Sequence, residues 1–221
     1  MKYRSVFDII GPIMIGPSSS HTAGAARIGR TARALFGREP KEVVITFYGS
    51  FAQTYRGHGT DVAIVGGILD FDTFDPRIPQ ALEIAAERGI RLAFRLSDGE
   101  APHPNTARVC LRDERGSLEL VGISIGGGKI EIVELNGFAL KLSGNDPALL
   151  VFHEDRYGMI AAVSNVLAKH AINIGHMEVA RRERGREALM VIETDQAIPE
   201  EVIREIAAIP HVLAANYVHP V

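Results

Sequence analysis

The C-terminal third of the chain alternates between apolar runs and amphipathic segments. The apolar run 148–152 predicts a strand, and Ile160, Val163 and Leu167 recur at helical spacing, which predicts a helix over 158–169. Pro199 favours the start of a second helix. Three more strands are expected over 172–179, 188–193 and 211–218, and the first two are joined by a hairpin loop at 181–186. This β-α-β-β-α-β order predicts a ferredoxin-like unit of about 70 residues.

The first two-thirds of the chain has a different pattern. Apolar residues from Ala25 to Leu35 recur every three or four positions, so a helix is expected from the serines at 18–20 to Gly37. The segment 143–147 has the composition of a linker, which places a boundary near residue 145. We therefore predict an α+β protein, with a mixed α/β domain over 1–145 and the ferredoxin-like domain over 146–221. The other expected elements of the first domain are helices over 60–69 and 79–88, and strands over 42–48, 90–95, 106–111, 117–124 and 129–135.

Composition and charge exclude several classes of protein. The 24 Lys and Arg residues against 27 Asp and Glu give a net charge of −3, which excludes a general basic surface for nucleic acid. No apolar run approaches the roughly 20 residues that span a bilayer, and residues 1–16 lack the pattern of a signal peptide. The single cysteine, Cys110, excludes an intramolecular disulfide. It also excludes an iron–sulfur cluster or a zinc site of several thiolates that this chain would build alone. We expect a cytoplasmic protein with no nucleic-acid or membrane partner.

The segment Gly16-Pro-Ser-Ser-Ser-His-Thr-Ala-Gly24 is the sharpest chemical feature of the sequence. It lies at the expected start of a helix, where free N–H groups and the helix dipole favour a carboxylate or a phosphate. His21 titrates in the range that suits an acid or a base near neutral pH. Further hydrogen-bond donors come from the hydroxyls of Ser18, Ser19, Ser20 and Thr22. The alternative is that one serine caps the helix and its neighbours are solvated.

Two loops supply further candidates. His58 lies between two glycines, after a strand and before a helix; the alternative is a plain turn with capping residues. Asp61 is expected to have a structural role in the first turn of that helix. His103 lies between two prolines, which favour an extended backbone, and Asn105 offers both a donor and an acceptor. The alternative there is a turn that precedes a strand. The run 126–129, Gly-Gly-Gly-Lys, lacks the spacing of a phosphate-binding loop and favours a flexible strand connection.

Taken together, these motifs resemble those of the iron–sulfur-dependent L-serine dehydratases, in the beta chain of the two-chain form. The segments 16–24, 50–54, 57–61 and 103–106 resemble the motifs of that family in the same order, and the C-terminal domain resembles an ACT domain, a small-molecule-sensing module. The resemblance implies an N-terminal substrate-binding domain and a 4Fe-4S cluster ligated by a separate alpha chain, with no metal ligand in this chain. It also implies a lyase of amino-acid catabolism and gluconeogenesis.

The reaction that the resemblance implies converts L-serine to pyruvate and ammonia. An iron of the partner's cluster would bind the serine hydroxyl as a Lewis acid, and a base would remove the Cα proton. His21 is the implied base, or a group that orients the substrate. The implied substrate-binding residues are Ser18, Ser19, Ser20, Thr22, His58, His103 and Asn105.

The ACT-like domain implies regulation by serine or a related amino acid, bound between two copies of the domain. Its candidate residues are Asp155 and Gly158 after the first strand and Asn173 before the second. A homodimer through the ACT domain, the N-terminal domain or both is expected, and a purely dimerising role is the alternative. Two other interpretations of the whole chain stay open: a non-catalytic amino-acid sensor, and a relative of the allosteric substrate-binding domain of some phosphoglycerate dehydrogenases. The serine-rich motif favours the enzyme subunit, because a sensor has no need of it.

Overall fold

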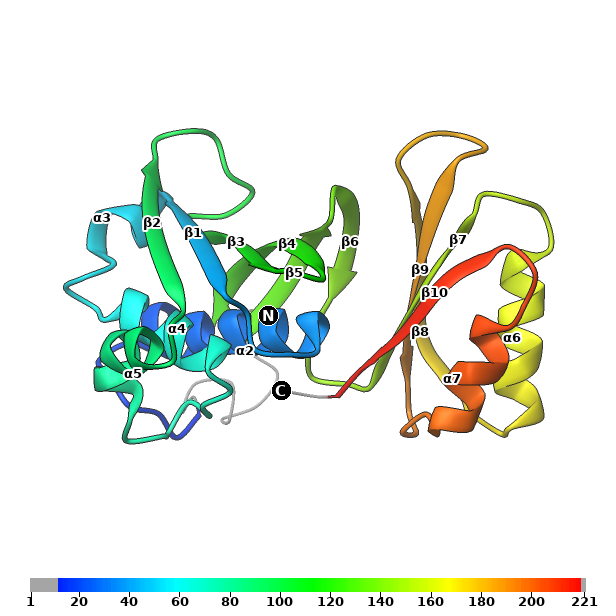
Figure 1. Ribbon diagram of the computed structural model, residues 1–221, viewed down its shortest axis with the longest axis horizontal. Coiled ribbons are helices and arrows are strands. Elements are labelled where there is room, and N and C mark those ends of the chain that lie inside the picture. The colour runs from blue at the N-terminus through cyan, green and yellow to red at the C-terminus, as the bar shows by residue number, and fades with distance from the viewer. Residues whose placement is uncertain (1–11, 220–221) are drawn as a thin grey trace, which may run out of the picture. The chain divides into compact units, whose positions relative to one another are not determined.

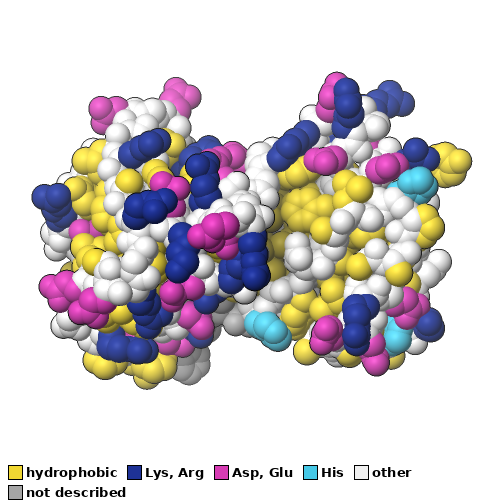
Figure 2. All heavy atoms as spheres, in the orientation of Figure 1, with side chains coloured by type: hydrophobic (Ala, Val, Ile, Leu, Met, Phe, Trp, Pro, Cys, Tyr) yellow, Lys and Arg dark blue, Asp and Glu magenta, His cyan; other side chains and the backbone are white. Residues whose placement is uncertain are grey.

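The computed structural model describes residues 12–219, so the expectation of no signal peptide over 1–16 falls mostly outside the described residues. The chain forms two compact units, Met1–Asn136 and Gly137–Val221 (Figure 1). Among the described residues, no helix is both long and apolar enough to cross a membrane. Figure 2 shows basic and acidic side chains interspersed over the visible face of the first unit, in keeping with the small net charge.

The first unit is built on a sheet with the strand order β2-β1-β3-β4-β5. Its strands are β1 (Glu42–Tyr48), β2 (Arg91–Ser97), β3 (Asn105–Asp113), β4 (Gly116–Gly126) and β5 (Lys129–Leu135). β1 and β2 are parallel, and the other neighbours are antiparallel. Tyr48, at the end of β1, pairs with Ser97 on one side and Thr106 on the other. The ends of β1 and β2 therefore meet the start of β3 at one edge of the sheet.

Helices cover one face of this sheet (Figure 1). They are η1 (Ser19–Ala23), α2 (Gly24–Phe36), α3 (Gly49–Thr54), α4 (Thr60–Ile68), the short 3-10 helix η2 (Ile78–Gln80) and α5 (Ala81–Glu87). α2 packs against α4 and against β3, β4 and β5. It ends at Gly37 as expected, because the glycine adopts a left-handed conformation (φ 72°) and its N–H bonds the Arg33 carbonyl. Helix α3 was not expected, and the first turn of the expected long helix is a separate π-helix, η1.

The second unit confirms the β-α-β-β-α-β order of the sequence prediction. Its sheet has the order β10-β7-β9-β8, and all neighbouring strands are antiparallel. One face of the sheet and the two helices enclose the core, with Leu149 and Ile192 from the strands and Val163 and Val202 from the helices. The elements are β7 (Ala148–Glu154), α6 (Met159–Lys169), β8 (Ile174–Arg181), β9 (Glu187–Thr194), α7 (Glu200–Ala207) and β10 (Val212–Val218).

An additional strand, β6 (Phe138–Leu142), begins this unit and was not expected. Within this unit it packs against β8 and β9, and Phe138 and Phe152 lie edge to face with ring centroids 6.0 Å apart. The buried residues Phe138, Leu140 and Leu142 alternate with exposed ones along it. The division between the units therefore falls after Asn136, earlier than the boundary near residue 145 that the linker composition favoured.

Candidate active site

The serine motif begins η1 with a side-chain cap. Ser18 has an extended backbone (φ −139°, ψ 123°), and its hydroxyl accepts a hydrogen bond from the His21 N–H at 3.1 Å. The Ala23 N–H then bonds the Ser18 carbonyl and the Gly24 N–H bonds the Ser19 carbonyl, each five residues back. Such widened turns are rare and often mark functional sites. The motif therefore does more than cap an ordinary helix.

The imidazole of His21 is held at both ring nitrogens. Its Nδ1 lies 3.0 Å from the hydroxyl of Ser20 and 3.4 Å from that of Ser18, and its Nε2 lies 2.9 Å from the hydroxyl of Ser50. The ring packs edge to face against Phe51 and His58, with centroids 5.3 Å and 4.8 Å away. A ring bonded on both sides and packed between two others has a defined orientation, as a catalytic base requires.

The environment of His21 favours the neutral imidazole. Burial lowers the pKa of His21 below its ordinary value of 6.5, and the neighbouring charge of His58 lowers it further. The neutral form of the ring is therefore favoured at pH 7. A neutral imidazole keeps one lone pair available, so the site can accept a proton.

His58 and Thr22 connect this site to α4. The Thr22 hydroxyl is buried and donates to the His58 carbonyl oxygen at 3.0 Å, which fixes the loop. The Nδ1 atom of His58 is buried and has no hydrogen-bond partner among the described residues. Asp61 has the structural role that was expected, because its carboxylate accepts the Val62 N–H at 2.9 Å in the first turn of α4. His58 thus keeps an unused polar atom beside His21.

The segment 103–106, which carries His103 and Asn105, approaches the start of α3. Gly49 and Asn105 form an isolated antiparallel bridge, and the Phe51 N–H bonds the Pro104 carbonyl at 3.4 Å. Gly49 has a φ of 51°, and a Cβ there would lie 2.7 Å from the Pro104 carbonyl oxygen, so only glycine fits. The backbone N–H of Asn105 donates to Nδ1 of His103 at 3.1 Å. His103 and Asn105 are therefore attached to the helix that carries Ser50.

Two residues of this region, Ser50 and Ser124, were not among the predicted site residues. Ser50 belongs to a segment that resembles a family motif, and the structure shows that its hydroxyl contacts His21. Ser124 of β4 accepts a hydrogen bond at its carbonyl from the Asn105 side chain at 3.4 Å, and its hydroxyl lies so close to Gly24 that a Cβ there would overlap it. The Ser124 hydroxyl is buried and has no hydrogen-bond partner in the described part of the chain. Only the tertiary structure brings these side chains to the motif.

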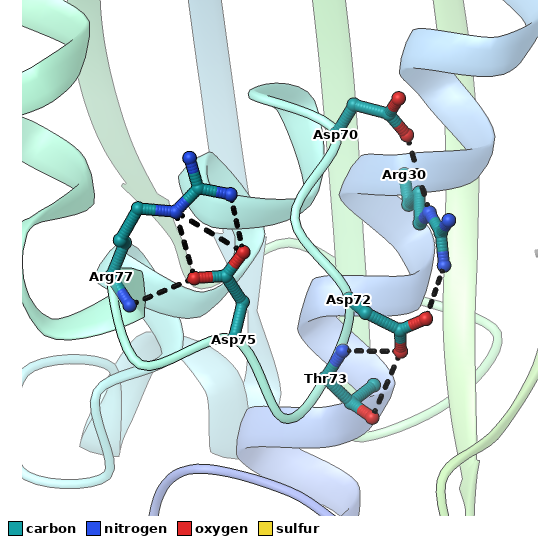
Figure 3. Close-up of polar contacts among 6 residues, drawn as sticks. All are labelled: Arg30, Asp70, Asp72, Thr73, Asp75 and Arg77. Atoms are coloured by element: carbon teal, nitrogen blue, oxygen red, sulfur yellow. Dashed lines mark hydrogen bonds and ion pairs between the residues drawn. The ribbon is translucent and has the colours of Figure 1, made fainter.

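A polar cluster fixes the segment that leads into the serine motif (Figure 3). Arg30 of α2 pairs with Asp70 at 3.2 Å and with Asp72 at 2.8 Å, and Asp72 accepts the Thr73 N–H at 2.7 Å. The hydroxyl of Thr73 donates to the carbonyl of Ile13, and the carbonyl of Thr73 accepts the N–H of Ile15, both at 2.7 Å. Asp75 and Arg77 form a second ion pair in the same loop. The loop after α4 therefore positions the chain just before Ser18.

The described residues of this chain do not fit an iron–sulfur cluster. The thiol of Cys110 donates to Glu119 at 3.0 Å, and burial together with the Glu119 carboxylate raises the pKa of Cys110 to about 12. A cluster ligand has to be a thiolate, which this environment opposes. Within residues 12–219, no group of three or more His, Cys, Asp or Glu side chains is placed to hold a metal ion.

The residues suggested for an effector site lie at opposite ends of β8. The carboxylate of Asp155 accepts the Gly185 N–H at 2.8 Å, which lowers the pKa of Asp155, and it pairs with Arg181, the last residue of β8. Asn173 precedes the first residue of β8 and donates to Asp195 at 2.6 Å. Gly158 caps α6 with a φ of 86°. One chain therefore does not bring Asp155 and Asn173 together.

Comparisons with known proteins agree with this architecture. The second unit is an ACT domain, since the model of that family matches residues 148–211. The family model described as serine dehydratase beta chain matches residues 5–134. The chain belongs to the serine dehydratase beta chain family, which confirms the resemblance drawn from its motifs.

Individual relatives extend the match over nearly the whole chain. The chain is 65% identical over 213 residues to a probable L-serine dehydratase beta chain of Bacillus subtilis (strain 168), covering 96% of this chain and 97% of the relative. It is 35% identical over 220 residues to the L-serine dehydratase beta chain of Peptoniphilus asaccharolyticus, covering 99% of each. A D-3-phosphoglycerate dehydrogenase of B. subtilis is 25% identical over 200 residues, which cover 88% of this chain and 37% of that protein. The full-length matches favour the enzyme subunit over the other two interpretations.

Proposed function

We propose that this chain is the beta subunit of an L-serine dehydratase, which deaminates L-serine to pyruvate and ammonia together with an alpha chain. The observation that carries the proposal is the geometry of the His21 imidazole, which the hydroxyls of Ser18 and Ser20 contact at Nδ1 and the Ser50 hydroxyl of α3 contacts at Nε2. The relatives that match the full length of the chain support the same reaction. We place the reaction in the cytoplasm.

His21 is the proposed base for the Cα proton of serine. Cα of an amino acid is a weak acid, so the base has to be neutral, close and fixed in orientation. The lowered pKa of His21 and its packing against Phe51 and His58 supply these properties. Loss of the proton and of the β-hydroxyl group gives aminoacrylate, whose imine form hydrolyses to pyruvate and ammonia.

The serine hydroxyls are the proposed ligands of the substrate carboxylate. Ser18, Ser19 and Ser20 are partly exposed at the positive end of a helix, which favours an anion. The proposed supporting contacts are Nε2 of His103, the side-chain carbonyl of Asn105 and Nδ1 of His58. Of these, Nδ1 of His58 is buried without a hydrogen-bond partner among the described residues. The Thr22 hydroxyl already bonds the His58 carbonyl, so its contribution to binding is to fix that loop.

The 4Fe-4S cluster of this enzyme class is assigned to the alpha chain. The raised pKa of Cys110 and the lack of a metal-binding group within residues 12–219 support this division.

We propose that the ACT domain binds serine or a related amino acid between two chains. Asp155 and Gly158 from one chain and Asn173 from its partner are the candidate contacts, since one chain holds Asp155 and Asn173 at opposite ends of β8. This arrangement makes the beta chain a homodimer. Titration calorimetry of the full chain with amino acids tests the binding site, and sedimentation tests the homodimer. A dimer that gives no heat with serine or other amino acids leaves only the dimerising role.

An anaerobic assay of pyruvate release tests the catalytic function. The beta chain is assayed alone and mixed with a cluster-loaded alpha chain, beside the variants His21→Ala and His170→Ala. His170 lies at the end of α6 and bonds Glu205, so it serves as the matched control. We expect activity only in the mixture, lost in His21→Ala and kept in His170→Ala. Full activity of a His21→Ala complex removes His21 from the chemistry, and a complete lack of activity with an intact cluster contradicts the proposed function.

A further inference from the structure

We propose that Ser50 is a positioning residue for His21: its hydroxyl holds Nε2, so that Nδ1 is the atom that takes the substrate proton. The inference rests on the proposed function, and it adds a residue and an atom to it. Ser50 comes from α3, 29 residues away from His21 in sequence, and its hydroxyl makes the shortest of the side-chain hydrogen bonds that the His21 ring forms, 2.9 Å from Nε2.

The backbone around Ser50 is firmly anchored. The next residue, Phe51, is fully buried and packs edge to face against Phe47 as well as against His21. The Thr54 hydroxyl donates to the Ser50 carbonyl at 2.8 Å, and the preceding residue, Gly49, is bridged to the start of β3. The Ser50 hydroxyl therefore sits on a rigid support, which suits a group that fixes another side chain.

The other ring nitrogen has two hydroxyl partners. Nδ1 faces the hydroxyls of Ser18 and Ser20, which lie 3.0–3.4 Å from it and 3.4 Å from each other. These two hydroxyls are also proposed ligands of the substrate carboxylate. When they turn to the carboxylate, Nδ1 is left without its resting partners and next to the substrate. Nε2 keeps its bond to Ser50 throughout.

The proposed role requires one tautomer of the neutral ring. A neutral imidazole has one N–H and one lone pair, and the hydrogen bond at one nitrogen fixes the state of the other. With the Nε2–H donating to Ser50, the lone pair is on Nδ1. In the reaction the Cα–H bond breaks and an N–H bond forms at Nδ1. The C–H electron pair becomes the Cα=Cβ bond as the β-hydroxyl leaves with its own bonding pair.

The tautomer is measured directly on the full beta chain by ¹⁵N NMR of its histidines at pH 8, with His21→Ala used to assign the signals. We expect Nε2 of His21 to carry the proton in the wild-type chain. Ser50→Ala is expected to give a mixture of tautomers, and Ser50→Thr, which keeps the hydroxyl, the wild-type pattern. A wild-type ring protonated at Nδ1, or an unchanged pattern in Ser50→Ala, overturns the proposal.

Kinetics of the complex with the alpha chain give the second readout. Ser50→Ala is expected to lower kcat by about 10²-fold, the order of loss expected from a misplaced catalytic group, with little change in KM. Ser50→Thr should recover most of the loss, and Ser164→Ala, on the exposed surface of α6, should have no effect. A raised KM with unchanged kcat contradicts a positioning role. An inactive wild-type complex counts against the proposed function, and the NMR result then decides the role of Ser50 by itself.

Discussion

Gly67 of α4 lies directly against Ala26 of α2, so closely that a Cβ on Gly67 would overlap the carbonyl oxygen of Ala26. Gly29 of α2 faces the Ile64 carbonyl in the same way. The two helices therefore approach each other backbone to backbone, and α2 continues from the turn that holds His21. The packing of two helices thus sets the position of the serine motif over the sheet.

Gly67→Ala is expected to lower the free energy of unfolding by about 1–3 kcal/mol, because the helices must separate to admit the methyl group. The better helix propensity of alanine, worth up to about 1 kcal/mol, acts in the opposite direction and only partly offsets this. Urea unfolding followed by circular dichroism measures the change. Gly57→Ala is the control, since a Cβ there meets only the Thr54 carbonyl oxygen at 3.7 Å. Equal stability of Gly67→Ala and the wild type would show that the helix contact is loose.

The sequence predicts the elements whose pattern is local. The apolar residues of α2 follow one helical face, and Gly37 marks its end. The strands and helices of the ACT domain likewise follow from their own periodicity. The π-turn at Ser19–Ala23 could not be predicted in this way: its Thr22 hydroxyl bonds a carbonyl 36 residues away, a contact that no local pattern reveals. The same holds for the site: its histidines are visible in the motifs, but the contact of Ser50 with His21 exists only after α3 has packed.

The strand β6 was missed because its alternation is short and follows a turn. Its buried residues are nevertheless expected to stabilise the second unit. Leu140→Ala should lower the free energy of unfolding by about 2–5 kcal/mol, since Leu140 is 3% exposed, whereas Lys141→Ala on the exposed side should change it little. Denaturant unfolding of both variants measures this. Equal effects at the two positions would show that β6 is not part of the core.

Cys110 is expected to react slowly with thiol reagents. A pKa of about 12 instead of 9.0 reduces the thiolate at pH 8 about a thousandfold, so alkylation by iodoacetamide should slow accordingly and recover in urea. Glu119→Gln should speed the reaction, because the carboxylate that helps to raise the pKa is removed. Glu134→Gln is the matched control, since Glu134 pairs with Arg108 and not with the thiol. A native rate equal to the rate in urea would contradict a partly buried, protonated thiol.

The His21 ring is expected to titrate below the ordinary pKa of histidine, 6.5. Its folded pKa lies below 6.5, so the unfolded chain takes up the proton first as the pH falls. The stability contribution of His21 is therefore complete above pH 6.5 and is lost as the pH falls toward the folded pKa. NMR titration of the His21 ring should give a midpoint below 6.5. His58→Ala should raise that midpoint, because it removes both a neighbouring charge and part of the burial, whereas His170→Ala should leave it unchanged. A midpoint at or above 6.5 in the wild-type chain would mean that His21 is protonated too readily to start the reaction as a neutral base.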